Sequence, residues 1–144
     1  RGGGRVAVVD ARRERPAVAR LLGLDEAPGM LEVLSGRAPL AHALRATPQA
    51  NLLALPHGRE RRGTAPRWTV EALRGLFREL REQCDLILID GPAWEGQAEG
   101  TALVAAVDAL YLVSTAQEPA IRADLLQALS RAGAPLRGQI LTGA

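Results

Sequence analysis

The sequence of 144 residues contains no lysine, so all 18 of its basic residues are arginine. Its one cysteine, Cys84, excludes an internal disulfide and agrees with a reducing compartment. Aromatic residues make up only 3% of the chain, and no apolar run reaches the roughly 18 residues of a membrane span. No signal peptide opens the chain, and the formal net charge is only +2. We therefore expect a cytoplasmic protein that does not bind nucleic acid.

Short apolar runs alternate with helical patterns along the chain, which is typical of βα units and a parallel sheet. The pattern predicts strands at residues 5–10, 51–55, 85–90, 108–113 and 137–142. It predicts helices from Pro16 to Gly23, at residues 30–34, 39–45, 69–83 and 101–107, and from Pro119 to Gly133. Residues 56–67 are predicted to form a polar loop. This length and pattern indicate one α/β domain over residues 1–144.

The helix predicted at residues 69–83 has the clearest buried face, because Leu73, Leu76, Phe77 and Leu80 recur at helical spacing. The same reasoning predicts buried side chains elsewhere in the chain. They are Leu21 and Leu22, Leu125, Leu126 and Leu129, Cys84, Tyr111 and the whole strand at residues 85–90. Trp68 and Trp94 are interpreted as packing or interface anchors. His42 and His57 have no acidic or thiol companions at ligand spacing, so we predict no metal site there.

Two of the predicted strands end in aspartate, in the sequences VAVVD and LILID. Parallel α/β sheets present ligand-binding groups at the carboxyl ends of their strands. Asp10 and Asp90 are therefore candidate Mg²⁺ ligands and candidate catalytic carboxylates. The competing interpretation is that each aspartate only terminates its strand. For Asp10 this interpretation has nearly the same weight as the metal-binding one. The neighbouring Arg12, Arg13 and Arg15 are interpreted as a solvated surface cluster.

Several segments, in the same order, resemble the bacterial tyrosine kinase domain of exopolysaccharide and capsule synthesis, a relative of the partition and division-site ATPases. VAVVDARRERPAVARLLGL resembles its second acidic motif, and LILIDGPAW its Walker B motif. EAPGMLEVLSGRAPLAHAL and NLLALPHG resemble its central insert and its following strand and turn. VDALYLVSTAQEPAIRADL and LLQALSRAGAPLRGQILTG match its closing strands and helix. The resemblance covers nearly the whole chain.

This resemblance implies a doubly wound parallel sheet of the P-loop NTPase-like, deviant Walker type. It implies that Asp10 and Asp90 are the catalytic and metal-binding residues, and that Arg15, Pro92 and Thr142 contact the cofactor. The implied cofactors, ATP and Mg²⁺, depend on a P-loop that this sequence lacks and that the family places upstream. The implied partner is a membrane-embedded polysaccharide co-polymerase, which would hold the chain at the inner face of the membrane.

The sequence departs from the family pattern at positions that bind Mg²⁺, phosphate or adenine in the family. Arg12 stands where the second acidic motif has another aspartate, and Glu14 stands where it has an arginine. A cation beside Mg²⁺ adds repulsion where the family supplies a carboxylate. The P-loop lysine cannot be supplied by a chain without lysine. Thr142 replaces an asparagine that reads adenine in the family, and it has less hydrogen-bonding capacity.

Three hypotheses about function follow from the sequence. The first is a degenerate, non-catalytic member of the family that acts as a binding or regulatory module. The second is the C-terminal portion of an active autokinase whose P-loop lies upstream. The third, a receiver-like signalling domain, fits poorly because Asp10 and Asp90 are too far apart in the chain and the receiver lysine is missing. A sheet without its first strand would expose an apolar edge, so we also expect self-association or a protein partner.

Overall fold

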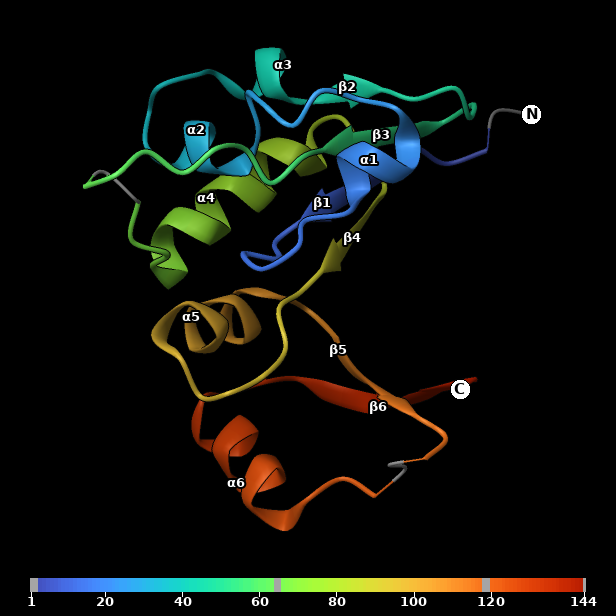
Figure 1. Ribbon diagram of the computed structural model, residues 1–144, viewed down its shortest axis with the longest axis vertical. Coiled ribbons are helices and arrows are strands. Elements are labelled where there is room, and N and C mark those ends of the chain that lie inside the picture. The colour runs from blue at the N-terminus through green and yellow to red at the C-terminus, as the bar shows by residue number, and fades with distance from the viewer. Residues whose placement is uncertain (1–2, 64–65, 118–119, 144) are drawn as a thin grey trace.

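The computed structural model describes residues 3–63, 66–117 and 120–143, which form two parallel-dominated sheets with helices packed on them (Figure 1). The larger sheet has the strand order β2-β3-β1-β4. Its strands are β1 (Val6–Asp10), β2 (Arg45–Ala46), β3 (Leu52–Leu55) and β4 (Leu86–Asp90). β1 pairs in parallel with both β3 and β4, whereas the short β2 pairs antiparallel with β3. β1 is therefore the centre of this sheet.

The second sheet consists of β5 (Leu110–Thr115) and β6 (Leu136–Thr142), which run parallel. The described helices are α1 (Val18–Leu22), α2 (Met30–Leu34), α3 (Leu40–Ala43), α4 (Val70–Arg81), α5 (Ala98–Ala106) and α6 (Ala123–Arg131). In Figure 1, β5, β6 and α6 lie below the larger sheet, on the far side of α5. Among the described residues we find no helix with the length and apolar character of a membrane span.

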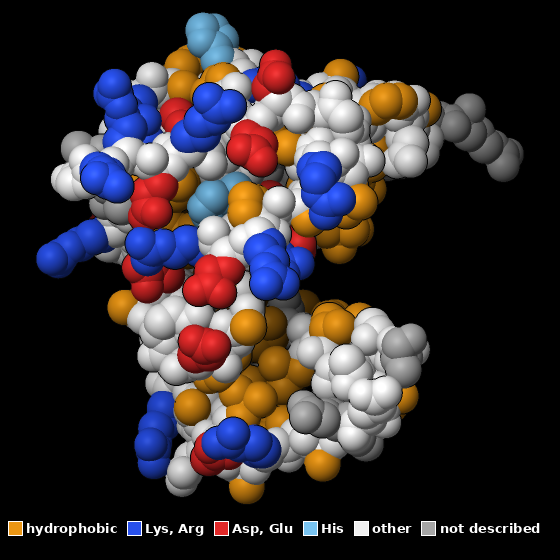
Figure 2. All heavy atoms as spheres, viewed as in Figure 1, with side chains coloured by type: hydrophobic (Ala, Val, Ile, Leu, Met, Phe, Trp, Pro, Cys, Tyr) orange, Lys and Arg blue, Asp and Glu red, His pale blue; other side chains and the backbone are white. Residues whose placement is uncertain are grey.

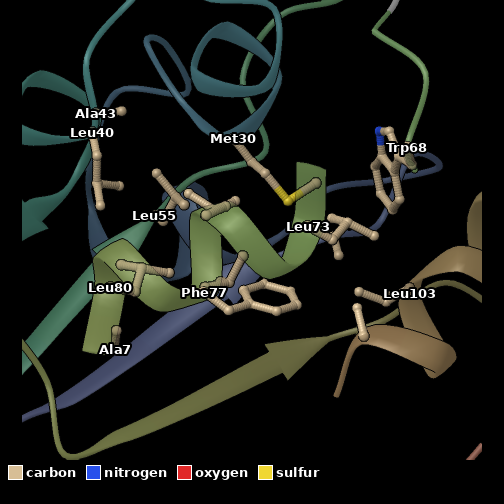
Figure 3. Close-up of a cluster of buried hydrophobic side chains, with 14 of the residues drawn as sticks. Ala7, Met30, Leu40, Ala43, Leu55, Trp68, Leu73, Phe77, Leu80 and Leu103 are labelled. Carbon is tan, nitrogen blue, oxygen red and sulfur yellow. The ribbon is translucent and has the colours of Figure 1, made fainter. Parts of the chain in front are cut away.

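Helix α4 organises the main core because its apolar face is continuous over three turns. Its N-terminus is capped by Thr69, whose Oγ1 accepts a hydrogen bond from the Ala72 N–H at 3.1 Å. Figure 3 shows the buried side chains that project from α4 among those of the neighbouring elements. The fully or nearly fully buried set includes Ala7, Val9, Met30, Leu40, Leu55, Leu73, Leu76, Phe77, Leu80 and Leu103. This core fixes β1 and β3 beneath α2 and α4.

The structure confirms the predicted α/β class and the parallel sheet. Each predicted element exists, α2 with the predicted bounds and the others with at least one end shifted. The antiparallel β2 was not predicted, because two residues carry no strand pattern. α5 begins three residues before the predicted start at residue 101. α6 begins at Ala123, while Pro119, the predicted helix start, lies outside the described residues.

Several side chains that the sequence pattern placed in the core are exposed. Leu21 is 72% exposed, and the strand at residues 85–90 is not fully buried, since Leu86 and Leu88 are half exposed. Tyr111, predicted to be packed, is also half exposed, and Leu126 is 40% exposed. Periodicity marks which side chains are apolar, but it does not show whether another element covers them.

Most of these exposed apolar side chains have one structural cause. β4 ends the order of the larger sheet and β5 pairs only with β6, so each has an edge without a strand partner in the part of the chain that the structure describes. Leu86 and Leu88 of β4, and Tyr111 and Val113 of β5, are the exposed residues of these two strands. Figure 2 shows hydrophobic side chains gathered in a hollow in the lower half of the molecule. An apolar strand edge without a partner favours association with another chain or segment.

Candidate functional site

The carboxyl ends of three adjacent parallel strands bring the candidate site together. Asp10 ends β1 and Asp90 ends β4, and the two residues are partners in the strand register. His57 lies two residues beyond Leu55, the end of β3, on the other side of β1. The sheet therefore places both predicted carboxylates at one edge, as expected for a parallel α/β sheet.

Asp10 is fully buried, and both of its carboxylate oxygens accept backbone hydrogen bonds. Oδ1 accepts the Arg12 N–H at 3.1 Å. Oδ2 accepts the N–H groups of Ala17 and Val18, at 2.8 Å and 2.9 Å. These bonds fold residues 11–17 around the carboxylate and anchor the start of α1. Three of the roughly four acceptor positions of this carboxylate are thus used by the chain itself.

Asp90 has a different environment, because its side chain is 44% exposed and forms an ion pair with Arg12. The Arg12 Nη1 lies 4.0 Å from Asp90 Oδ2, a loose ion pair. Partial burial raises the pKa of Asp90, although the Arg12 charge opposes this rise and the Asp10 charge adds to it. Asp10 keeps at most one free acceptor position, whereas no hydrogen bond to the Asp90 carboxylate is made within the described residues. The cation beside it is Arg12, a residue of the chain itself.

The loop after β3 is held against α2 by backbone hydrogen bonds. The N–H groups of Met30 and Leu31 donate to the carbonyls of Pro56 and His57, at 2.8 Å and 2.9 Å. The buried Glu32 accepts the Gly29 N–H with Oε2 and the Arg59 N–H with Oε1. The two segments cross so closely that a Cβ on Gly29 would lie 2.4 Å from the Pro56 carbonyl oxygen. This crossing fixes the position of His57.

A pocket of about 310 Å³ lies at this edge of the sheet. Its apolar wall includes Ala11, Leu31, Trp68 and Pro92, and its polar lining includes His57 and Gln97. Arg12 and Arg13 line it together with Glu14, Glu60, Glu95 and Glu99. Arg13 connects two sides of the opening, since its guanidinium lies 2.8 Å from Glu60 and 3.8 Å from Glu99. The pocket is therefore built mainly from the loop that follows β1 (residues 11–17, the β1 loop), the loop that follows β3 (residues 56–63, the β3 loop) and the segment before α5.

His57 is 7% exposed, and its ring is packed against Trp68 with 6.3 Å between centroids. Its Nδ1 lies 3.3 Å from the Asp10 carbonyl oxygen. Because a carbonyl only accepts, Nδ1 carries the proton of the neutral ring in this contact. Burial lowers the pKa of His57, and the Asp10 carbonyl and the nearby charges of Asp10, Glu60 and Glu32 oppose this shift in part. The folded protein therefore favours the neutral imidazole.

The lowered pKa of His57 predicts a loss of stability in mild acid. The unfolded state binds the proton more readily than the folded state, so the free energy of unfolding should fall as the pH decreases below about 6.5. Urea denaturation over this range measures the effect. A His57→Gln variant should show a flatter dependence, while His42→Gln, on the exposed side of α3, should retain the wild-type slope. Equal slopes in all three proteins would contradict the prediction.

The other predicted site residues divide between two places. Pro92 lines the pocket, whereas Arg15 is exposed and is not part of the pocket lining. Thr142 lies in the second sheet, where its Oγ1 donates to the Ser114 carbonyl at 3.3 Å. The fold therefore groups Asp10, Asp90 and Pro92, and it places Thr142 on a different sheet. Among the described side chains, no three of the His, Cys, Asp or Glu type are arranged to hold a metal ion.

His57 and Trp68 are two pocket residues that the sequence did not assign to a site. His57 follows a predicted strand in the sequence LPHG, which is a signal for a site only when the order of the strands is known. β3 lies beside β1, and this neighbourhood brings His57 to Asp10. Trp68 was correctly interpreted as a packing residue, since it is 9% exposed and belongs to the core. Its position in the wall of the pocket could not be predicted from the spacing of residues in the sequence.

Comparison with known proteins gives structural matches only. No family model and no curated protein matches the sequence. The VpsO kinase domain superposes with a TM-score of 0.77 at 22% identity, over 98% of this chain and 71% of that one. The kinase domain of the Escherichia coli tyrosine kinase ETK gives a TM-score of 0.81 at 20% identity, over 98% of this chain and 56% of that one.

A third match is the septum site-determining protein MinD of Pyrococcus horikoshii, in complex with Mg-ADP. Its TM-score is 0.74 at 26% identity, over 96% of this chain and 58% of that protein. The chain thus spans a little over half the length of the ETK kinase domain and of MinD. Its fold is that of the bacterial tyrosine kinase domains and their MinD-like relatives, as its sequence motifs predicted.

Proposed function

We propose that this chain is a degenerate tyrosine-kinase-like module, which binds or regulates a protein partner in exopolysaccharide or capsule synthesis and export without catalysing phosphoryl transfer. The observation that carries this proposal is the state of Asp10. Its carboxylate is buried and accepts three backbone hydrogen bonds, so it acts as a structural anchor of the β1 loop. A carboxylate in that position is poorly available to a metal ion.

The surrounding charges support the same function. Arg12 points a guanidinium toward Asp90, in the place where a nucleotide-bound Mg²⁺ would need a negative or neutral surround. The chain also supplies no lysine for the β- and γ-phosphates. The residues of this site therefore do not fit Mg·ATP, and we assign no catalytic step to Asp10 or Asp90.

Calorimetric titration with Mg·ADP tests this proposal. We expect no saturable binding to the chain and no ATP turnover above buffer, because the phosphate-binding cation is missing and the Asp10 carboxylate is already engaged. A competent MinD-like ATPase titrated in parallel provides the positive control. A dissociation constant in the low micromolar range for this chain would overturn the proposal.

A second candidate function is favoured by the separation of the two sheets. β4 and β5 have no strand between them in the described structure, and the chain covers only part of the kinase domains it superposes on. An upstream segment with a P-loop could complete an active autokinase. Extending the chain by the parent gene's upstream sequence tests this candidate, because Mg·ADP affinity and autophosphorylation should appear together in the longer protein. A longer protein without either property would exclude it.

The proposed partner is a protein, either a second copy of the chain or a membrane-embedded polysaccharide co-polymerase. Such a partner would recruit the chain to the inner face of the membrane. The proposal of a protein partner is supported by the exposed apolar residues of β4 and β5, which a soluble monomer leaves in contact with water.

A further inference from the structure

The pocket beside His57 offers more hydrogen-bond acceptors than donors. Arg12 and Arg13 contribute its cationic side chains, but each already faces a carboxylate, Asp90 in one case and Glu60 with Glu99 in the other. The carboxylates of Glu14 and Glu95 have no ion pair or side-chain hydrogen bond within the described parts of the chain. The glutamates of the lining outnumber its arginines, so the pocket carries a net negative charge and favours a cationic ligand that donates hydrogen bonds.

The buried imidazole provides a second and independent acceptor. His57 lines the pocket, is more than nine-tenths buried, and uses Nδ1 for the Asp10 carbonyl. Its Nε2 has no hydrogen-bond partner among the residues that the structure describes. Backbone contacts of the β3 loop with α2 hold the ring in place, so this nitrogen is presented without further rearrangement. Solvent reaches this nitrogen, since it is not among the buried side-chain atoms of the described residues that lack a partner, and a ligand that donates to it would complete the hydrogen bonding of the ring.

The remaining wall of the pocket is apolar and partly aromatic. Leu31, Pro66 and Pro92 line it beside Trp68, whose indole packs against His57. An arginine side chain matches this combination, because its methylene stem packs on apolar groups and its planar guanidinium stacks on aromatic rings. The guanidinium also donates several hydrogen bonds in one plane, and carboxylates accept them in pairs.

We propose that this pocket binds an arginine side chain presented by a partner polypeptide, with the guanidinium between His57 and the Glu95 side of the opening. The inference rests on the proposed function, since a non-catalytic module needs a recognition site rather than a nucleotide site. It goes further by stating which side chain the partner supplies. Phosphate and nucleotide ligands suit this pocket poorly, because glutamates outnumber arginines in its lining and would repel an anion.

Nuclear magnetic resonance titration of the histidine ring protons tests this proposal on the intact chain. The chain has only two histidines, so His42 on α3 provides an internal control and a His42→Gln variant assigns both signals. The probes are the peptide acetyl-Gly-Arg-Gly-amide and its citrulline counterpart, which has nearly the same shape without the charge. We expect the arginine peptide to shift the His57 signal saturably and the citrulline peptide to bind about tenfold more weakly.

A matched pair of variants locates the effect. Glu95→Gln should weaken binding of the arginine peptide by about fivefold, whereas Glu79→Gln, an equal charge change on the exposed side of α4, should leave it unchanged. Equal affinity for both peptides, equal shifts of His42 and His57, or no shift of His57 would overturn the proposal. Tighter binding of inorganic phosphate or of a tyrosine peptide would overturn it as well. Mg·ADP titration is scored separately, so failure of the arginine site is distinguished from failure of the proposed function.

Discussion

Asp10→Ala is expected to lower the free energy of unfolding by about 2–4 kcal/mol. The substitution removes the acceptor of three backbone N–H groups, those of Arg12, Ala17 and Val18, in a site where Asp10 is fully buried. Donors left without a partner in the folded state account for most of the loss. The β1 loop and α1 should become the least stable region. Urea denaturation measures the change, and amide hydrogen exchange locates it in residues 11–22.

Asp90→Ala is the matched control, because it removes the carboxylate at the partner position of the neighbouring strand. Partial burial raises the pKa of Asp90, so the charged carboxylate is less stable in the folded protein than in the unfolded chain. We expect Asp90→Ala to leave stability within about 0.5 kcal/mol of the wild type or to increase it. Equal losses in the two variants, or stabilisation of the wild type by Mg²⁺ that both variants abolish, would instead indicate a shared metal site.

The chain is expected to self-associate through the apolar edges of β4 and β5. Leu88 is 52% exposed and Val113 is 66% exposed, and each lies on a strand with a free edge among the described residues. Burying such side chains against a second copy contributes about 25 cal/mol for each Å² removed from water. Sedimentation velocity over a concentration series should therefore show dimers or larger species. The Leu88→Arg/Val113→Arg double variant should raise the dissociation constant at least about tenfold.

Leu21→Arg provides the control for this experiment. Leu21 is the most exposed large apolar residue, at 72%, but it lies on α1 and not on either free strand edge. Its substitution should leave the association unchanged, which separates the edge effect from a general effect of added charge. A wild-type chain that remains monomeric at several hundred micromolar would contradict the prediction, and so would equal loss of association in both variants.

The elements with strong periodicity could be predicted well from the sequence alone. α4 has its four predicted core residues buried, and β1 and β4 end at the predicted aspartates. Both strands are short apolar runs that contain β-branched residues and are bounded by polar residues, a pattern that favours strands over helices. The two-residue β2 and the exposed side chains of β4 could not be predicted, because pairing and coverage depend on distant segments.

The candidate site was predictable only in part. The carboxylates at the ends of β1 and β4 were found because a parallel sheet places strand ends at one edge. The engagement of Asp10 by Ala17 and Val18 depends on the path of the β1 loop, which local propensity does not determine. His57 entered the site because β3 lies next to β1, a neighbourhood that strand patterns do not specify.

Composition and motif order were therefore sufficient to determine the fold class of this protein and the absence of a lysine for phosphate. They were also sufficient to place Asp10 and Asp90 at one edge of a parallel sheet. Only the tertiary structure shows that the Asp10 carboxylate accepts backbone hydrogen bonds and that Arg12 forms an ion pair with Asp90. It also shows that His57 lines a pocket. The reason is that hydrogen bonding and charge act over a few ångströms, and distances of that size between segments exist only after the chain has folded.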